Sequence, residues 1–237
     1  MKKKLSARSK SRKNRLISNR IPTMAKIVME SIKEDLMNYF SSHPEINSIG
    51  EKPTRQSPYF AQISLTDDLR LWVNAFIRYT YYPRNDKVVN SYINTLSVGD
   101  IVEYILDYDF VQSVISKETK YYLTTLYDLC EYYIKNYLSR KDYTLGEIMD
   151  HFSLIWARDV TYFDCGTIEE ARKTPLPREF SISRCGSDRE DKEFNYISEI
   201  CVNYRLVGRD DSGRQTATNI NIDIHLSDLI DKVLQKG

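Results

Sequence analysis

The sequence lacks the short motifs that mark several common enzyme and membrane-protein classes. No apolar run reaches the roughly 18 residues that a membrane-spanning helix needs, and the N-terminus has no apolar segment of a secretory signal. The patterns GxxxxGKS/T, GxGxxG and GxSxG are also absent, so nothing indicates a P-loop, a dinucleotide-binding fold or an esterase-type nucleophile. We therefore expect no membrane association and no cofactor.

Cysteine and histidine are scarce and are not spaced as metal ligands. Cys130, Cys165, Cys185 and Cys201 form no CxxC pair, and the three histidines form neither HExxH nor HxxxH. We expect reduced, unpaired thiols in an intracellular protein, either cytoplasmic or nuclear. A contact between Cys165 and Cys185, each of which precedes a glycine, is the alternative.

Acidic residues are missing from the first 26 positions, which hold ten basic residues. The rest of the chain has 24 basic residues against 33 acidic ones, so its formal charge is −9 although the whole chain carries +1. A cationic arm attached to an acidic body points to an anionic partner, either a nucleic acid or the acidic surface of a neighbouring subunit.

Residues 1–22 are predicted to form a flexible arm, because they are basic and poor in large apolar side chains. We expect nine side chains of this arm to neutralise the phosphates of a nucleic acid. They are Lys2, Lys3, Lys4, Arg8, Lys10, Arg12, Lys13, Arg15 and Arg20. A nuclear import signal, an organellar presequence and a solubilising tail are the alternative interpretations.

The strongest structural pattern lies near the C-terminus. Apolar and polar residues alternate with a period of two over residues 199–206 and again over 219–226, on either side of the turn sequence GRDDSG. This pattern predicts a long antiparallel hairpin with one apolar face. On this hairpin we expect Glu199 to lie opposite Asp223, and Ile197 to lie opposite His225.

The middle of the chain is predicted to be mainly helical. Thr23 is the expected N-cap of a helix that ends near residue 41, and residues 59–82 favour a hairpin over a helix. From 86 to 157 we expect helices, including one over about 117–139 and another that starts at a Thr144–Glu147 capping box and continues through Trp156. These expectations give an α+β fold, with residues 23–237 as a single domain.

Residues 158–192 lose the regular pattern, apart from a short helix capped by Thr167 and a strand near Phe180–Arg184. We expect this segment to include a loop that contacts a partner, since irregular segments often carry function. A last short helix is predicted to begin at a Ser227 cap.

Two groups of polar residues are candidates for chemistry. Glu199, Asp223 and His225 share the polar face of the hairpin and are candidates to share a proton or hold a divalent cation. Asp150 and His151 are a second acid–histidine pair, which more often lies at the edge of a core than in an active site. The polar face of a half-exposed sheet is the simpler explanation of the first group.

The sequence therefore predicts a non-enzymatic, nucleic-acid-associated protein, whose body mediates self-association or docking of a protein partner. The alternatives are a metal-dependent enzyme, such as a nuclease, that uses Glu199, Asp223 and His225, or a protein-interaction subunit whose arm is a targeting signal. We expect no catalytic residue and no metal site in the leading interpretation.

Overall fold

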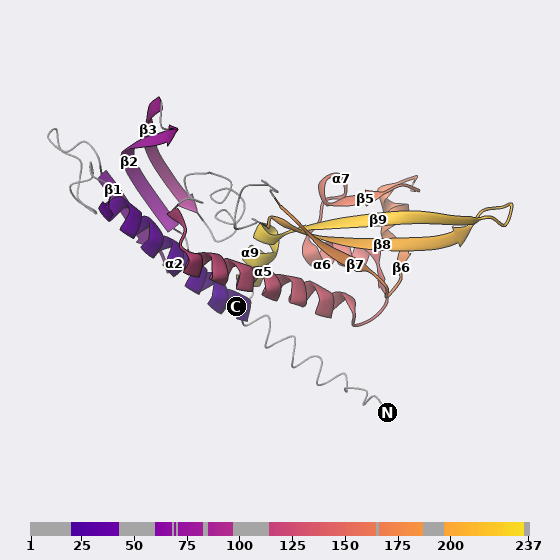
Figure 1. Cartoon of the computed structure of the whole chain (residues 1–237). Coiled ribbons are helices and arrows are strands. Elements are labelled where there is room, and N and C mark those ends of the chain that lie inside the picture. The colour runs from indigo at the N-terminus through magenta and orange to yellow at the C-terminus, as the bar shows by residue number, and fades with distance from the viewer. Residues whose placement is uncertain are drawn as a thin grey trace. The chain divides into compact units, whose positions relative to one another are not determined.

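The computed structural model describes residues 20–42, 60–67, 69, 71–82, 85–96, 114–164, 166–186 and 197–234. Helices and antiparallel strands occur together in these ranges, so the predicted α+β class is confirmed (Figure 1). The chain divides into two compact units, one of residues 22–126 and one of residues 1–21 with 127–237. The predicted single domain over residues 23–237 stays a prediction, and residues 1–19 of the predicted arm lie outside the described ranges.

The unit of residues 22–126 contains most of α2 (Arg20–Ser42) and the first part of α5 (Lys117–Leu138). Helix α2 begins at Arg20, ahead of the predicted cap at Thr23, and Ile21 is fully buried. One stripe of α2 is buried at helical spacing: Ala25, Val28, Met29, Ile32 and Leu36. This stripe supplies the apolar face that the sequence pattern predicts.

A buried polar contact joins α2 to the start of α5. The Asp35 carboxylate accepts hydrogen bonds from the Ser116 backbone N–H at 2.9 Å and from the Thr119 hydroxyl at 2.5 Å. Thr119 is fully buried, so its hydroxyl needs these partners. The charged acceptor strengthens both hydrogen bonds and fixes the N-terminal turn of α5 beside α2.

Three strands form an antiparallel sheet in this unit in the order β1 (Phe60–Leu65), β2 (Leu71–Tyr82) and β3 (Asn85–Leu96). The predicted hairpin over 59–82 is confirmed, with Leu65 paired to Leu71. The helix predicted from Asp86 is wrong, because residues 85–96 pair with β2 instead. Val88 and Val89 suit a strand as well as a helix stripe, and strand pairing decides between them. The helix predicted after residue 97 lies outside the described residues.

The unit that contains residues 127–237 is built on a four-stranded antiparallel sheet in the order β5–β9–β8–β7. Its strands are β5 (Val160–Tyr162), β7 (Ser181–Cys185), β8 (Glu199–Arg209) and β9 (Gln215–His225). The predicted long hairpin is therefore confirmed as β8–β9, and the strand predicted near 180–184 is confirmed as β7. One face of the hairpin is buried through Ile200, Val202, Tyr204, Ile220, Ile222 and Ile224.

Short helices complete this unit. They are α6 (Leu145–Phe152), α7 (Trp156–Asp159), α8 (Ile168–Arg172) and α9 (Leu226–Leu234). The Thr144–Glu147 capping box and the Thr167 cap are confirmed. The helix predicted through Trp156 ends at Phe152, because Ser153 adopts a left-handed conformation with φ 60°.

Two further predictions in this unit need correction. Helix α9 begins at Leu226, so Ser227 lies in its first turn rather than before it. Residues 158–186 are also more regular than predicted, since β6 (Pro175–Leu176) pairs there with β4 (Tyr143–Thr144). The described residues of the expected irregular segment therefore hold the end of α7, one complete short helix and three strands.

Candidate functional site

The register of the β8–β9 hairpin decides which polar side chains meet. Glu199 pairs with His225 and Cys201 pairs with Asp223, so the predicted pairing of Glu199 with Asp223 is wrong by two positions. The error comes from the expected position of the turn. Gly208 and Arg209 still belong to β8 and pair with Thr216 and Gln215, so the turn consists of residues 210–214. A shift of two residues keeps each side chain on its predicted face and changes only its partner.

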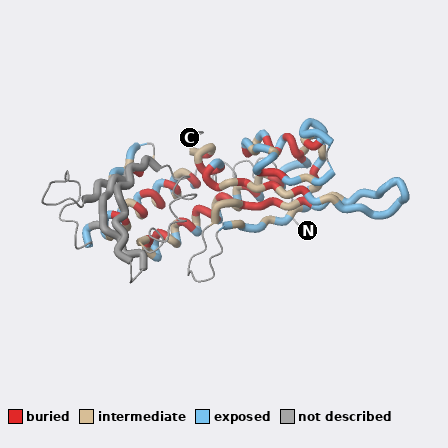
Figure 2. Tube along the Cα trace, turned by 90° about the horizontal axis from the view of Figure 1, so that it is seen from above, coloured by how far each residue is buried: buried red, intermediate tan, exposed pale blue. Residues whose placement is uncertain are grey.

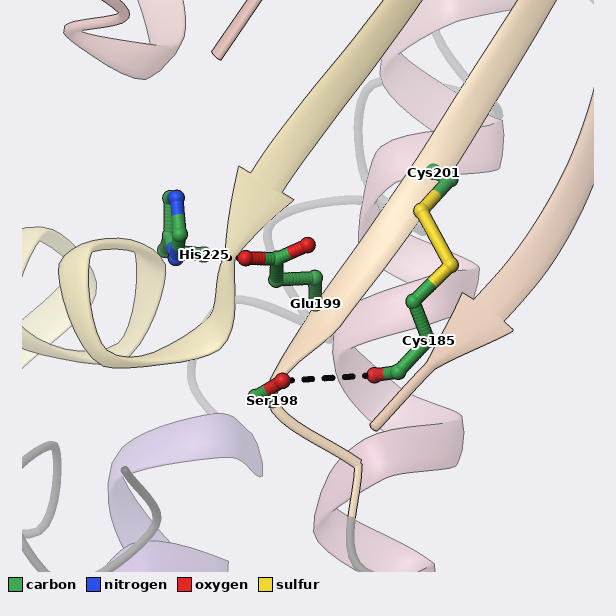
Figure 3. Close-up of a disulfide and its surroundings, with 5 residues drawn as sticks. All are labelled: Cys185, Ser198, Glu199, Cys201 and His225. Atoms are coloured by element: carbon green, nitrogen blue, oxygen red, sulfur yellow. Dashed lines mark hydrogen bonds and ion pairs between the residues drawn. A yellow bond between two sulfur atoms is a disulfide. The ribbon is translucent and has the colours of Figure 1, made fainter. Parts of the chain in front are cut away.

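His225 is held between two carboxylates at the end of β9. Its Nδ1 lies 3.2 Å from Glu199 Oε1, and its Nε2 lies 3.1 Å from Asp159 Oδ1. Figure 3 shows His225 beside Glu199, where β9 and β8 meet. The histidine side chain is only 12% exposed and that of Asp159 only 4%, so both contacts are largely shielded from water. Each ring nitrogen therefore lies beside one carboxylate oxygen.

Arg158 adds a positive charge to the same cluster. Its Nε donates a hydrogen bond to His225 Nε2 at 3.2 Å and lies 3.4 Å from Asp159 Oδ1. A neutral His225 with its proton on Nδ1 satisfies this arrangement, because it donates to Glu199 and accepts from Arg158. The cluster ties α7 to the adjoining ends of β8 and β9.

Asp159 is a structural member of the cluster. Its Oδ2 accepts a hydrogen bond from the Ile155 backbone N–H at 2.6 Å, which satisfies a donor at the start of α7. Its Oδ1 is buried and has no hydrogen-bond partner among the described residues, although Arg158 and His225 approach it. The sequence analysis missed this residue, because only the fold brings α7 against the end of β9.

Asp223 lies next along the polar face of β9. Burial raises the pKa of its carboxyl, attraction to His225 lowers it, and repulsion from Asp159 raises it further, so that the pKa lies above its ordinary value. Oxygen or sulfur atoms of Glu199, Cys201 and Asp223 lie within 4.8 Å of one another, which is a spacing that metal ligands can adopt. The predicted trio of Glu199, Asp223 and His225 is therefore gathered on one sheet face, with Cys201 among them.

The sulfur of Cys201 takes part in a different bond. Cys185 of β7 and Cys201 of β8 form a disulfide (Figure 3). A metal-binding cysteine must be a thiolate, so the disulfide leaves this group with two carboxylates in place of three ligands. The prediction of unpaired thiols is wrong for these two cysteines. The intracellular location, which depended partly on that prediction, remains a prediction.

The other cysteines differ in their surroundings. Cys130 is a free, buried thiol on α5, and burial raises its pKa to about 12. A thiol with so high a pKa is almost entirely protonated at neutral pH and is a poor nucleophile. Cys165, the alternative partner for Cys185, lies outside the described residues.

The Asp150–His151 pair does not form an acid–base dyad. Asp150 accepts a hydrogen bond from Arg172 at 2.7 Å, whereas the His151 ring stacks on Tyr137 with its centroid 3.5 Å away. The Nε2 of His151 also lies 3.2 Å from the Tyr133 hydroxyl. These contacts pack α6 against α5 and confirm the structural interpretation of this pair.

Of the nine predicted phosphate-binding residues, one lies within the described residues. Arg20 is the first residue of α2 and is exposed. The other eight predicted residues, from Lys2 to Arg15, lie outside the described residues. The structure therefore places only the end of the basic segment.

The far end of the β8–β9 hairpin is a feature whose importance the sequence analysis missed. Strand β7 pairs with residues 199–203 of β8, and β5 pairs with residues 220–222 of β9. Within the described part of the chain, residues 205–209 and 215–219 pair as strands only with each other, and most of them are exposed (Figure 2). The sequence did contain one indication of this feature. Strands β8 and β9 have 11 residues each, whereas β5 and β7 have 3 and 5, so the hairpin must extend beyond its neighbours.

Comparisons of the chain with family models, curated proteins and solved structures found no match. Among the described residues, no helix is both long and apolar enough to cross a membrane. The functional argument therefore depends on the chemistry of this chain alone.

Proposed function

We propose that this protein associates with nucleic acid without enzymatic activity, through a basic N-terminal segment that contacts the phosphate backbone. The folded units then mediate self-association or docking of a protein partner. The observation that supports the proposal is the charge distribution, with ten basic residues and no acid among the first 26, and a net charge of −9 on the remainder. Lysine and arginine that neutralise phosphates release condensed counterions, which is the main source of non-specific affinity.

The ion pairs of the unit that contains residues 127–237 also support a phosphate contact through the N-terminal segment. Four of its arginines lie within 4.0 Å of a carboxylate oxygen: Arg158, Arg172, Arg178 and Arg184. Because these cations are already paired within the protein, they attract phosphate less than free cations do. The first 26 residues, in contrast, hold ten basic residues and no acidic residue that could pair with them locally.

Deletion of residues 2–18 tests the proposal without damage to the fold. The deletion stops short of Arg20 and Ile21, because α2 begins there and Ile21 is fully buried. It removes eight basic residues and changes the formal charge of the chain from +1 to −7. Circular dichroism and the melting temperature should therefore stay unchanged.

Fluorescence anisotropy with a labelled DNA duplex supplies the measurement. The full chain should show an affinity whose logarithm falls linearly with the logarithm of salt concentration, with a slope of several units. The deletion should weaken binding by about 100-fold at physiological salt and flatten the slope. A variant with residues 2–18 in scrambled order keeps the charge and should bind as the full chain does. An unchanged affinity or slope after the deletion would assign the arm to targeting or solubility instead.

The metal-dependent enzyme gains no specific support from the geometry. Its three predicted residues lie together, but His225 is engaged with Glu199 and Asp159, and Arg158 occupies the same cluster. A guanidinium group beside these carboxylates supplies the positive charge that a cation would otherwise bring. We therefore propose a single function.

A further inference from the structure

The far end of the β8–β9 hairpin forms a two-stranded ribbon, here called the distal ribbon, which consists of residues 205–209 and 215–219 with the turn 210–214. Figure 1 shows it extending past the ends of β5 and β7 in the same unit, and Figure 2 shows it almost entirely exposed. Five residues per strand at about 3.3 Å each give a length of roughly 16 Å.

The turn gives this ribbon a defined tip. The Asp210 carboxylate accepts hydrogen bonds from the Ser212 backbone N–H and from the Arg214 backbone N–H, both at 2.9 Å. Gly213 follows with φ +79°, a left-handed conformation that favours glycine. The hydrogen bonds, led by the one from the Ser212 hydroxyl, hold the pKa of Asp210 below its ordinary value. This carboxylate is therefore occupied in shaping the turn.

One face of the distal ribbon carries arginine and amide side chains in direct cross-strand pairs. Arg205 pairs with Asn219, and Arg209 pairs with Gln215. Residues directly opposite in an antiparallel pair lie on the same face, and the next pair toward the sheet on that face, Asn203 with Asn221, is also polar. Between the two arginine pairs the same face carries an apolar pair, Val207 with Ala217, so its residues over 203–209 and 215–221 supply two cations, four amides and no acid.

The arginines on this face differ from those elsewhere in the unit. Arg158, Arg172, Arg178 and Arg184 all contact carboxylates, whereas the side chains of Arg205 and Arg209 make no hydrogen bond or ion pair with any other described residue. Both are exposed. Their five-donor guanidinium groups are available to bind an external acceptor.

We propose that the distal ribbon enters the major groove of duplex DNA, with the face of Arg205 and Arg209 toward the base edges. This proposal rests on the proposed nucleic-acid function and assigns it a second contact surface. Arginine pairs with the guanine O6 and N7 acceptors, and asparagine or glutamine pairs with adenine N6 and N7. The major groove of B-form DNA, about 12 Å wide and 8.5 Å deep, admits a two-stranded ribbon. The deep, narrow major groove of A-form RNA does not admit side chains, so the expected duplex is DNA.

The test replaces Arg205 and Arg209 with glutamine in the full-length chain. A charge-matched control replaces Lys173 and Arg178 with glutamine, since both are exposed and lie outside the ribbon. We expect R205Q/R209Q to bind a DNA duplex about tenfold more weakly than the control does, because each bidentate arginine contact contributes substantial affinity. Binding to single-stranded DNA and to duplex RNA should match that of the control within about threefold, because the arm contacts their phosphates.

A second variant removes the amides and keeps the charge. Asn219→Ala with Gln215→Ala should weaken duplex binding by about fivefold without changing its salt slope, whereas Thr216→Ala on the opposite face should have no effect. Neither change removes a buried side chain, so the fold should persist.

Each result separates this inference from the proposed function. If the full chain binds no nucleic acid, the proposed function and the ribbon contact both fail. If the full chain binds and loses affinity on deletion of residues 2–18, while R205Q/R209Q binds duplex DNA as the control does, only the ribbon contact is overturned. An equal loss on single strands and duplexes also overturns it. So does a change in self-association, measured by analytical ultracentrifugation, with unchanged duplex affinity.

Discussion

The two halves of the β8–β9 hairpin are paired in one continuous register but differ in side-chain pattern and in surroundings. In the proximal half, residues 199–204 and 220–225, β7 pairs with residues 199–203, β5 pairs with residues 220–222, and the apolar face is buried. In the distal ribbon, no described strand lies alongside, and Val207 is 57% exposed. Strand pairing therefore continues through both halves, but only the proximal half has the alternating apolar residues that form a core.

The polar faces of the two halves differ in the same way. In the proximal half, polar side chains lie against one another, as His225 does with Glu199 and Asp159. Distal charges on Arg205 and Arg209 have no partner among the described residues. Polar groups that are paired within a protein stabilise it, and those left unpaired at an exposed surface are available to a ligand.

The largest expected difference between the halves is in packing. Val202 is fully buried and Val207 is mostly exposed on the same strand, so Val→Ala removes the same atoms from two environments. Val202→Ala should lower the free energy of unfolding by about 2 kcal/mol, through lost burial and a residual cavity. Val207→Ala should change it by less than about 0.5 kcal/mol. Denaturant unfolding followed by circular dichroism measures both, and equal effects would contradict the division into halves.

A smaller effect should come from the proximal polar cluster. Asp159→Ala removes the acceptor of the Ile155 backbone N–H and leaves His225 and Arg158 without this carboxylate. The loss should lower the free energy of unfolding by about 1–2 kcal/mol, because the group is buried and charged. Asp228→Ala, at a position whose side chain is 55% exposed, is the control and should have little effect. If both variants unfold alike, the cluster contributes nothing to stability.

The smallest expected effect is a pH dependence at Asp223. Because its pKa is raised in the folded protein, the folded state binds the proton more tightly than the unfolded state does. The charged form therefore costs stability, and this cost appears as the pH rises above the ordinary value of 3.8 and is complete above the folded pKa. Asp223→Asn should raise the melting temperature at pH 7 by less than about 2 °C, since the side chain is only half-buried.

The pH series also contains its own control. Near pH 3 the Asp223 carboxyl of the parent is mostly protonated in both the folded and the unfolded state. The Asp223→Asn variant and the parent should therefore have the same melting temperature there. Asp211→Asn at the exposed turn should leave the melting temperature unchanged at pH 7. A lower melting temperature for Asp223→Asn at pH 7 would show that attraction to His225 outweighs the cost of burial.

Local patterns in the sequence predict much of this fold. The alternation around residues 199–226, the Thr144–Glu147 capping box and the helical pattern of residues 117–139 each act within a few neighbouring residues, and the structure confirms all three. Strand β3 was missed because its apolar residues fit both a helix and a strand, and pairing with β2 selects the strand.

The candidate site depends more on distant contacts. The sequence places Glu199, Asp223 and His225 on one face, but their partners follow from where the turn lies. Asp159 joins them only because α7 packs beside β9, and Cys185 reaches Cys201 only through the pairing of β7 with β8. The availability of Arg205 and Arg209 likewise depends on where β5 and β7 end.

Hydrogen–deuterium exchange of the full chain, with and without a DNA duplex, tests nucleic-acid binding and the contrast between the halves together. On addition of DNA, amides of residues 205–219 should gain protection, whereas those of residues 199–204 and 220–225 should stay as they are. The segment 2–18 should also exchange more slowly, because its basic side chains contact phosphates. Binding at saturating DNA with no change over 205–219 would contradict the ribbon contact, and no change in either segment would contradict the proposed function.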